Sequence, residues 1–225
     1  MSEFLTTFAL ARKDLLQEVR SKAVTVATLF FSGLVLVILA FAIGPSDIAL
    51  ANAAPGVLWV ALAFAGVISA AQSYQTELEE GALEQLLLYP VPRAVIFLGK
   101  LAANWLFMSL LGFILLPLST TLFGAPLTEN WAWLLLTILL GTLGFSLIAT
   151  FYAALTANLR ARESLLPVLM FPVVVPVLLA AVRSTGEIMR SGNLQIAQDW
   201  LQLLVGFDLI YLVVCTTIFP FVVEE

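Results

Sequence analysis

The sequence has 225 residues, of which 61% are hydrophobic and only 11% are charged, and its formal net charge is −5. A soluble globular domain is about half apolar and about a quarter charged, so this composition excludes one and indicates a polytopic membrane protein. The chain contains no histidine, the commonest metal and haem ligand, and its one cysteine, Cys215, excludes an internal disulfide. The sequence contains no cluster of basic residues of the kind that would indicate nucleic-acid binding.

Residues 1–22 combine charge with apolar side chains at helical spacing. The apolar positions are Phe4, Phe8, Ala11, Leu15 and Val19. This pattern predicts an amphipathic helix in the membrane interface, with Arg12 extending towards water. A helix packed on the rest of the protein fits the pattern equally well.

Six apolar stretches are long enough to cross a bilayer, since a transmembrane helix needs about 20 mostly apolar residues. They lie at about residues 24–43, 55–73, 94–123, 131–157, 164–182 and 200–223. We therefore expect a single transmembrane domain over residues 1–225, all α-helical, without a separate soluble domain. We expect the first stretch to be a membrane span rather than a signal peptide, because its charged lead is too long and five more spans follow.

The second span places Trp59 near one interface and carries a stripe of small residues. The stripe comprises Ala61, Ala65, Ser69 and Ser73. Small residues let helices approach closely in lipid, so the stripe predicts packing, with a substrate groove as the alternative.

The later spans carry prolines and tryptophans with local consequences. Pro117 is expected to kink the third span, and Trp131 and Trp133 to anchor the fourth at the interface. The fifth span contains Pro167, Pro172 and Pro176, which predict a bent or broken helix. Residues 183–199 are polar and are expected to be irregular.

The longest polar stretch, residues 76–93, separates the second and third spans. Thr76 and Glu79 resemble a capping box, so a short amphipathic helix is predicted to begin at Thr76 and to end before Pro90. It could lie passively on the lipid surface, or it could dock a soluble partner that moves the spans. We favour docking.

The distribution of basic residues predicts the orientation. One side would hold eight of them: Arg12, Lys13, Arg20, Lys22, Arg93, Lys100, Arg160 and Arg162. The other side would hold only Arg183 and Arg190. The positive-inside rule then places both termini and residues 76–93 in the cytoplasm.

Few residues of this sequence belong to a pattern typical of catalysis or nucleotide binding. The chain has no GxxxxGK[ST] loop for ATP and no Ser/His/Asp or Cys/His set. Asp208, in the sixth span, is a functional candidate because a charge inside a membrane is expensive, although water or Arg183 could satisfy it. Because the chain has no ATP-binding loop of its own, transport would take its energy from an ion gradient or from a separate ATPase.

Several stretches resemble the haem exporter protein B (CcmB) family of ABC-2 type permeases. They are IGP at 43–45, APGVLWV at 54–60, GALEQLLLYPVP at 81–92, LLGT at 139–142, and LLP at 165–167 with Pro172 and Pro176. The stretch at 81–92 is similar to that family's G-x-L-E-Q-L-x-x-x-P-x-P pattern. Residues 1–22 and 183–199 carry none of these motifs.

The resemblance implies a six-span permease subunit of the cytochrome c maturation complex in the bacterial cytoplasmic (inner) membrane. ATP would be bound by a partner ATPase, CcmA, with CcmC, CcmD and the haem chaperone CcmE associated and a second permease copy expected. Hydrolysis would drive haem export or release of the loaded chaperone. This chain would bind no cofactor, and haem would be a cargo without histidine ligation here.

The resemblance also implies a coupling site that receives the motion of the ATPase. Its residues would be Glu80, Gly81, Leu83, Glu84, Gln85, Leu86, Pro90, Pro92, Arg160 and Arg162. Leu83 and Leu86 are the expected anchors, whereas Gly81 would mark either a close approach of the partner or a simple helix break. An ABC-2 exporter of a lipid, drug or glycan and a non-transporting scaffold are the alternative functions.

Overall fold

The computed structural model describes residues 3–21, 23–79, 91–125, 130–157, 159, 162–190 and 194–222. All regular structure in these residues is helical. The helices are α1 (Glu3–Ser21), α2 (Ala23–Ile43), α3 (Asp47–Glu79), α5 (Arg93–Phe123), α6 (Trp131–Thr156), α7 (Arg162–Arg190) and α8 (Leu194–Val222). Six of them, α2, α3 and α5 to α8, are long and apolar enough to cross a membrane. The expected all-α polytopic membrane fold is therefore confirmed.

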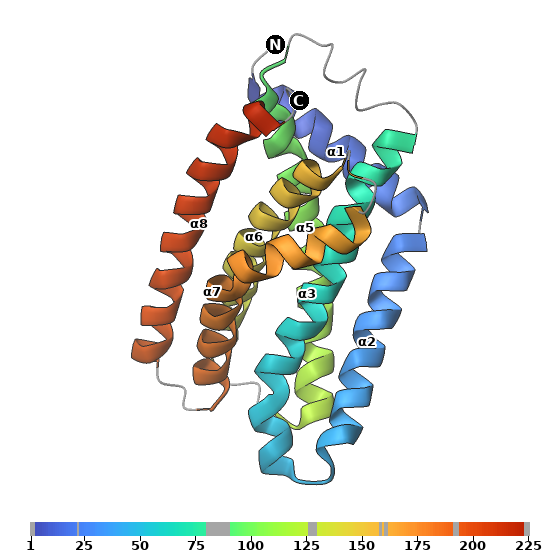
Figure 1. The fold of residues 1–225 in the computed structure, drawn as a ribbon. Helices are drawn as coiled ribbons and strands as arrows, with labels where there is room; N and C mark the ends of the chain where they lie inside the picture. The colour runs from blue at the N-terminus through green and yellow to red at the C-terminus, as the bar shows by residue number, and fades with distance from the viewer. Residues whose placement is uncertain are drawn as a thin grey trace.

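The spanning helices form a bundle with α1 across one end (Figure 1). In this view α2 and α8 lie on opposite sides of the bundle, while α3, α5, α6 and α7 pack between them. The start of α1 and the end of α8 lie at the same end of the molecule. Six crossings require this arrangement, so the hydrophobic pattern and the fold agree.

Helix α1 packs on protein along one side and leaves apolar side chains exposed on another. Ala11 is buried, and Leu10 lies against Gly99 of α5, where an added Cβ would be 2.7 Å from the Leu10 Cβ. Leu5 and Phe8 are exposed. Phe8 was expected on the same face as Ala11, but the protein-facing side is centred nearer Leu10. Helix α1 thus combines features of both sequence-based alternatives.

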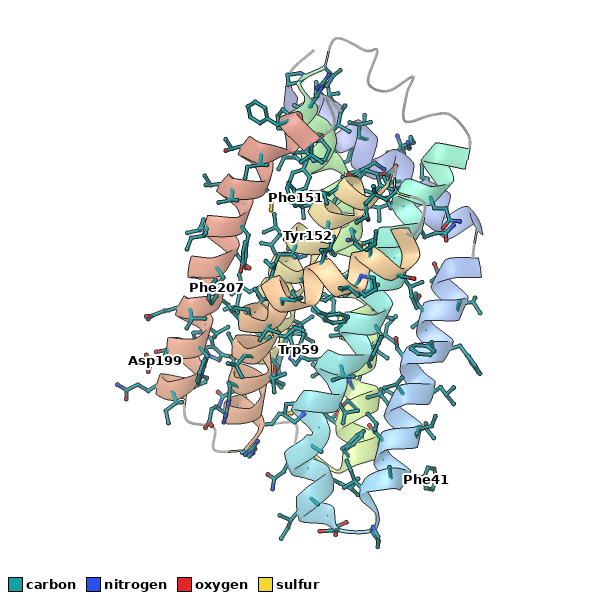
Figure 2. All side chains as sticks on the ribbon, in the orientation of Figure 1. Phe41, Trp59, Phe151, Tyr152, Asp199 and Phe207 are labelled. Carbon is teal, nitrogen blue, oxygen red and sulfur yellow. The ribbon has the colours of Figure 1, made fainter. Side chains whose placement is uncertain are left out.

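Trp59 is not the interfacial residue that the sequence suggested. Its side chain is only 2% exposed and its Nε1 donates a hydrogen bond to Thr185 Oγ1 of α7 at 3.0 Å. The ring packs against Gly141 of α6, where an added Cβ would lie 2.3 Å from Cη2. Figure 2 shows Trp59 inside the bundle. Its indole therefore joins α3, α6 and α7, with its polar N–H satisfied.

The proline-rich helix α7 is bent but continuous. In Figure 1 its first part lies across α6 and α3, and its last part runs along the bundle. Prolines remove backbone donors, and neighbouring helices can satisfy carbonyls near such a bend. Tyr211 of α8 does so, because its hydroxyl donates to the Val173 carbonyl oxygen at 3.0 Å. Pro117 likewise lies inside α5, and its carbonyl oxygen accepts the Thr121 hydroxyl at 2.6 Å.

Three spans extend beyond their predicted ends. Helix α3 begins at Asp47 rather than at about Pro55, because Ser46 Oγ accepts the Ala49 N–H at 3.4 Å and caps the helix. It continues through Glu79, so the helix start predicted at Thr76 is wrong.

The expected irregular segment at 183–199 is also mostly helical. Helix α7 continues to Arg190 and α8 begins at Leu194, so only residues 191–193 fall outside the described part. Polar side chains at helix ends can reach water while the backbone stays hydrogen-bonded. The hydrophobic pattern alone therefore ended α7 too early and began α8 too late.

The small-residue stripe of α3 faces the bundle interior. Ala61 and Ala65 are fully buried, and Ser69 is 7% exposed. Ser32 of α2 donates to the Ala61 carbonyl oxygen at 3.5 Å. The prediction that this stripe serves helix packing is in agreement with these contacts.

Candidate functional site

Most of the predicted coupling residues lie outside the described residues. These are Glu80, Gly81, Leu83, Glu84, Gln85, Leu86, Pro90 and Arg160. Arg162 is the first residue of α7, and Pro92 immediately precedes α5, where its carbonyl oxygen accepts the Val95 N–H at 2.9 Å. The docking surface itself thus remains a sequence prediction. The structure instead describes where the two ends of the stretch at 80–90 are anchored.

A buried lysine connects the helices at these two ends. Lys100 of α5 is 3% exposed, and its Nζ lies 3.6 Å from Asp14 Oδ2 of α1. The same ammonium donates to Ser73 Oγ of α3 at 3.4 Å and stands 4.6 Å from the Tyr74 ring centroid. We call Asp14, Ser73, Tyr74 and Lys100 the Lys100 cluster.

The Lys100 cluster is costly to break. Removing one partner from a buried ion pair typically destabilises a protein by about 3–5 kcal/mol, because the other charge stays buried and uncompensated. Asp14 also contacts Lys13 at 3.2 Å, but the Lys13 side chain is 42% exposed, and exposed pairs contribute only about 0–1 kcal/mol. Lys100 is therefore the partner that fixes α1 to the bundle.

A second polar contact lies one helical turn further along α5. The Asn104 Oδ1 accepts the Ser69 hydroxyl of α3 at 3.1 Å, and its Nδ2 donates to Thr150 Oγ1 of α6 at 3.2 Å. Lys100 and Asn104 share one face of α5 because residues four apart are neighbours on a helix. Together they join α3, α5 and α6 through buried polar side chains.

The first residue of α5 connects this end of the bundle to α8. Arg93 Nη1 donates to the Pro220 carbonyl oxygen at 3.1 Å. The last carbonyls of a helix have no partner within it, and a cation there also interacts favourably with the helix dipole. Arg93 therefore caps α8. Four helices, α1, α3, α5 and α8, are linked at the end of the bundle where the predicted coupling stretch begins and ends.

Asp208 occupies a separate position, between α6, α7 and α8. It is 5% exposed, and neither carboxylate oxygen has a hydrogen-bond partner among the described residues. The expectation that Arg183 could satisfy it is wrong, since Arg183 is exposed and makes no hydrogen bond to it. Nor do the described residues contain a group of three His, Cys, Asp or Glu side chains that could hold a metal ion.

Sequence reasoning missed the Lys100 cluster although a clue was present. Lys100 lies inside a predicted span, and an intramembrane charge is a functional candidate by default. The charge distribution along the sequence identifies it only as one of the basic residues on the cytoplasmic side. No sequence pattern predicts that Asp14 would be its partner, because the two belong to different helices.

Two of the sequence stretches that resemble the family contact each other in the fold through Trp59. Trp59, from the stretch at 54–60, packs on Gly141 from the stretch at 139–142. The neighbouring Thr142 shares a hydrogen bond of 2.9 Å with Ser109 of α5.

A family model described as CcmB protein matches residues 5–224. The chain belongs to the CcmB family.

Individual CcmB relatives match over most of their length. The chain is 36% identical to heme exporter protein B of Pseudomonas aeruginosa over 151 residues, which cover 67% of each chain. It is 34% identical to heme exporter protein B of Haemophilus influenzae over 170 residues, or 76% of each chain. The protein of the same name from Rhodobacter capsulatus is 32% identical over 184 residues, or 82% of each chain.

Proposed function

We propose that this chain is the permease subunit of an ATP-driven ABC complex for cytochrome c maturation. The observation that carries the proposal is the match of the CcmB family to residues 5–224, which include every described spanning helix. The relatives named heme exporter protein B point to haem as the cargo or as the group carried by the cargo. The chain contains no histidine, so these residues would handle haem without histidine ligation.

The energy for this work would come from a separate ATPase subunit. The sequence has no phosphate-binding loop of its own, and the family resemblance implies CcmA as the ATPase. The stretch at 80–90 would receive its motion. That stretch connects α3 to α5, whose ends are joined through Ser73 and Lys100, so a push there would move both helices together with α1.

The same proposal places the protein in the bacterial cytoplasmic membrane with both termini in the cytoplasm. The excess of basic residues at one side supports this orientation. CcmC, CcmD and the haem chaperone CcmE are the further partners that the resemblance implies. A second permease copy is expected because two ATPase subunits normally close on each other. Either haem itself or the loaded chaperone would be released outside.

Purification of the tagged chain from its own membranes in mild detergent tests the proposal. We expect an ATPase subunit to co-purify in a stoichiometric amount, together with haem-handling membrane proteins. An ATPase without haem-handling proteins would instead support an exporter of a lipid, drug or glycan. A chain that purifies reproducibly without any ATPase would contradict the proposal and indicate a scaffold.

A further inference from the structure

Asp208 is a buried charge for which the proposed function gives no role. The residue belongs to α8, and its side chain is 5% exposed. This side chain has neither a hydrogen bond nor an ion pair among the described residues. Lys100, the other buried charged residue among those whose side chains the structure describes, has Asp14 opposite it. The two therefore differ in kind: one charge is compensated and the other is not.

The carboxyl of Asp208 lies directly against the backbone of α6. A Cβ added to Gly144 would lie 2.3 Å from Asp208 Oδ1, and 3.0 Å from Val177 Cγ1 of α7. Any side chain at residue 144 would therefore overlap the carboxyl. Glycine leaves the space that Asp208 fills, and the methyl groups of Val177 border the same space.

Among the side chains that the structure describes, no charged group of a neighbouring helix is hydrogen-bonded to Asp208. Helix α6 has no acidic or basic residue at all. The described charged side chains of α5 and α7 are Arg93, Lys100, Arg183, Glu187 and Arg190. None of them is bonded to Asp208. The other titratable groups along α6 and α8 are Tyr152, Asp199, Tyr211 and Cys215. Asp199 is exposed, and Tyr211 donates its hydroxyl to the Val173 carbonyl oxygen instead.

Three kinds of ligand could compensate a buried carboxylate: a metal ion, a basic group or a proton. Hard cations need about six or more oxygen ligands, and the described part of the chain offers no cluster of acidic or other metal-binding side chains. No basic side chain among the described residues is hydrogen-bonded to Asp208. A proton needs neither space nor further ligands, and it removes the cost of burying the charge.

We propose that Asp208 is a proton-binding site, and that α8 can pack on α6 at Gly144 only while this carboxyl is neutral. Loss of the proton would leave an unpaired carboxylate in an apolar interior, so it requires the α6–α8 contact to open and admit water. Proton binding at Asp208 is thereby linked to a movement of α8 relative to α6. This inference does not depend on the identity of the cargo or on the ATPase.

The stability of the purified full-length chain as a function of pH tests this site. Wild type, Asp208→Asn and Asp199→Asn would be compared in detergent from about pH 5 to about pH 9, above the ordinary carboxyl range. Asp199 is an ideal control, because it lies on the same helix but is exposed and points outward (Figure 2). Unfolding the wild type releases the proton into water, so its thermal midpoint should fall as the pH rises.

Asp208→Asn keeps the shape of a neutral carboxyl but cannot ionise, so its midpoint should lose that part of the pH dependence. Asp199→Asn should follow the wild type. Identical pH profiles for wild type and Asp208→Asn would overturn the proposal. A wild type that gains stability relative to Asp208→Asn as the pH rises would also overturn it, because that sign belongs to an ionised, paired carboxylate.

Infrared spectroscopy of the wild type provides a second measurement that does not require the variant to fold. Isotopic labelling of aspartate carboxyls should shift a protonated C=O band at neutral pH. The chain has four aspartates, Asp14, Asp47, Asp199 and Asp208, and only Asp208 is both buried and without a partner. A spectrum at neutral pH without any protonated aspartate band would contradict the proposal.

Discussion

The indole ring of Trp59 packs so closely on Gly141 that an added Cβ at residue 141 would lie 2.3 Å from the ring atom Cη2. The two residues come from separate sequence motifs and lie on α3 and α6. Trp59 is also fixed by its hydrogen bond to Thr185 of α7. This contact therefore holds three spanning helices in one arrangement.

Gly141→Ala should destabilise the bundle by about 1–3 kcal/mol, the usual cost of overpacking a filled core. Thermal unfolding in detergent would measure the change. Gly206→Ala is the matched control, because no atom lies within 4 Å of a Cβ added there, and it should unfold close to the wild type. Equal midpoints for the two variants would show that Trp59 can move away at little cost.

Lys100→Met should be far more damaging than Lys13→Met, although both lysines contact Asp14. The first change leaves Asp14 without its buried partner, and we expect a loss of about 3–5 kcal/mol. The second removes an exposed pair with a contribution of about 0–1 kcal/mol. Limited proteolysis at the N-terminus would follow the release of α1. If both variants were cleaved at the same rate, Lys100 would not be what holds α1.

Leu83→Asp should abolish co-purification of the ATPase while the chain still inserts into the membrane. An apolar anchor at an interface can contribute about 2 kcal/mol or more, whereas a single surface charge contributes little. Gly81→Trp should act like Leu83→Asp, and Glu77→Gln should have little effect. Normal partner binding by Leu83→Asp would instead place the coupling surface at residues 160–163.

Cysteine labelling in intact cells should report the predicted orientation. Cysteines placed at Asp47, Glu129 and Gly192 should react with an impermeant thiol reagent from outside. Those placed at Glu84 and Arg162 should react only after the cells are opened. The native Cys215 is buried, so the background should be low. Labelling of a cysteine at Glu84 from outside would reverse the orientation and remove the docking hypothesis.

The hydrophobic pattern was enough to predict the number of spans and the helical class. Each span is a long apolar run, and lipid leaves such a run no alternative to a helix. The same pattern could not place the ends of α3 at Asp47 and Glu79. Helix ends depend on local hydrogen bonds, such as the one to Ser46, and on polar side chains that extend to water.

The sequence did not predict which side chains of different helices contact each other. Trp59 was assigned to an interface because tryptophan is common there, but a glycine on α6 opens a buried position for it. Lys100 needed Asp14, a residue from another helix, to become a buried ion pair. Asp208 was recognised as an unusual charge, but its contact with Gly144 emerges only when α6 and α8 are packed together.

Haem staining of c-type cytochromes in the protein's own host would decide whether this chain serves cytochrome c maturation, as we propose. Deletion of the gene should abolish covalently attached haem in these cytochromes, while their polypeptides are still made and exported. The wild-type gene should restore it, and Leu83→Asp should not. Unchanged c-type cytochromes in the deletion strain would show that this chain does not serve cytochrome c maturation.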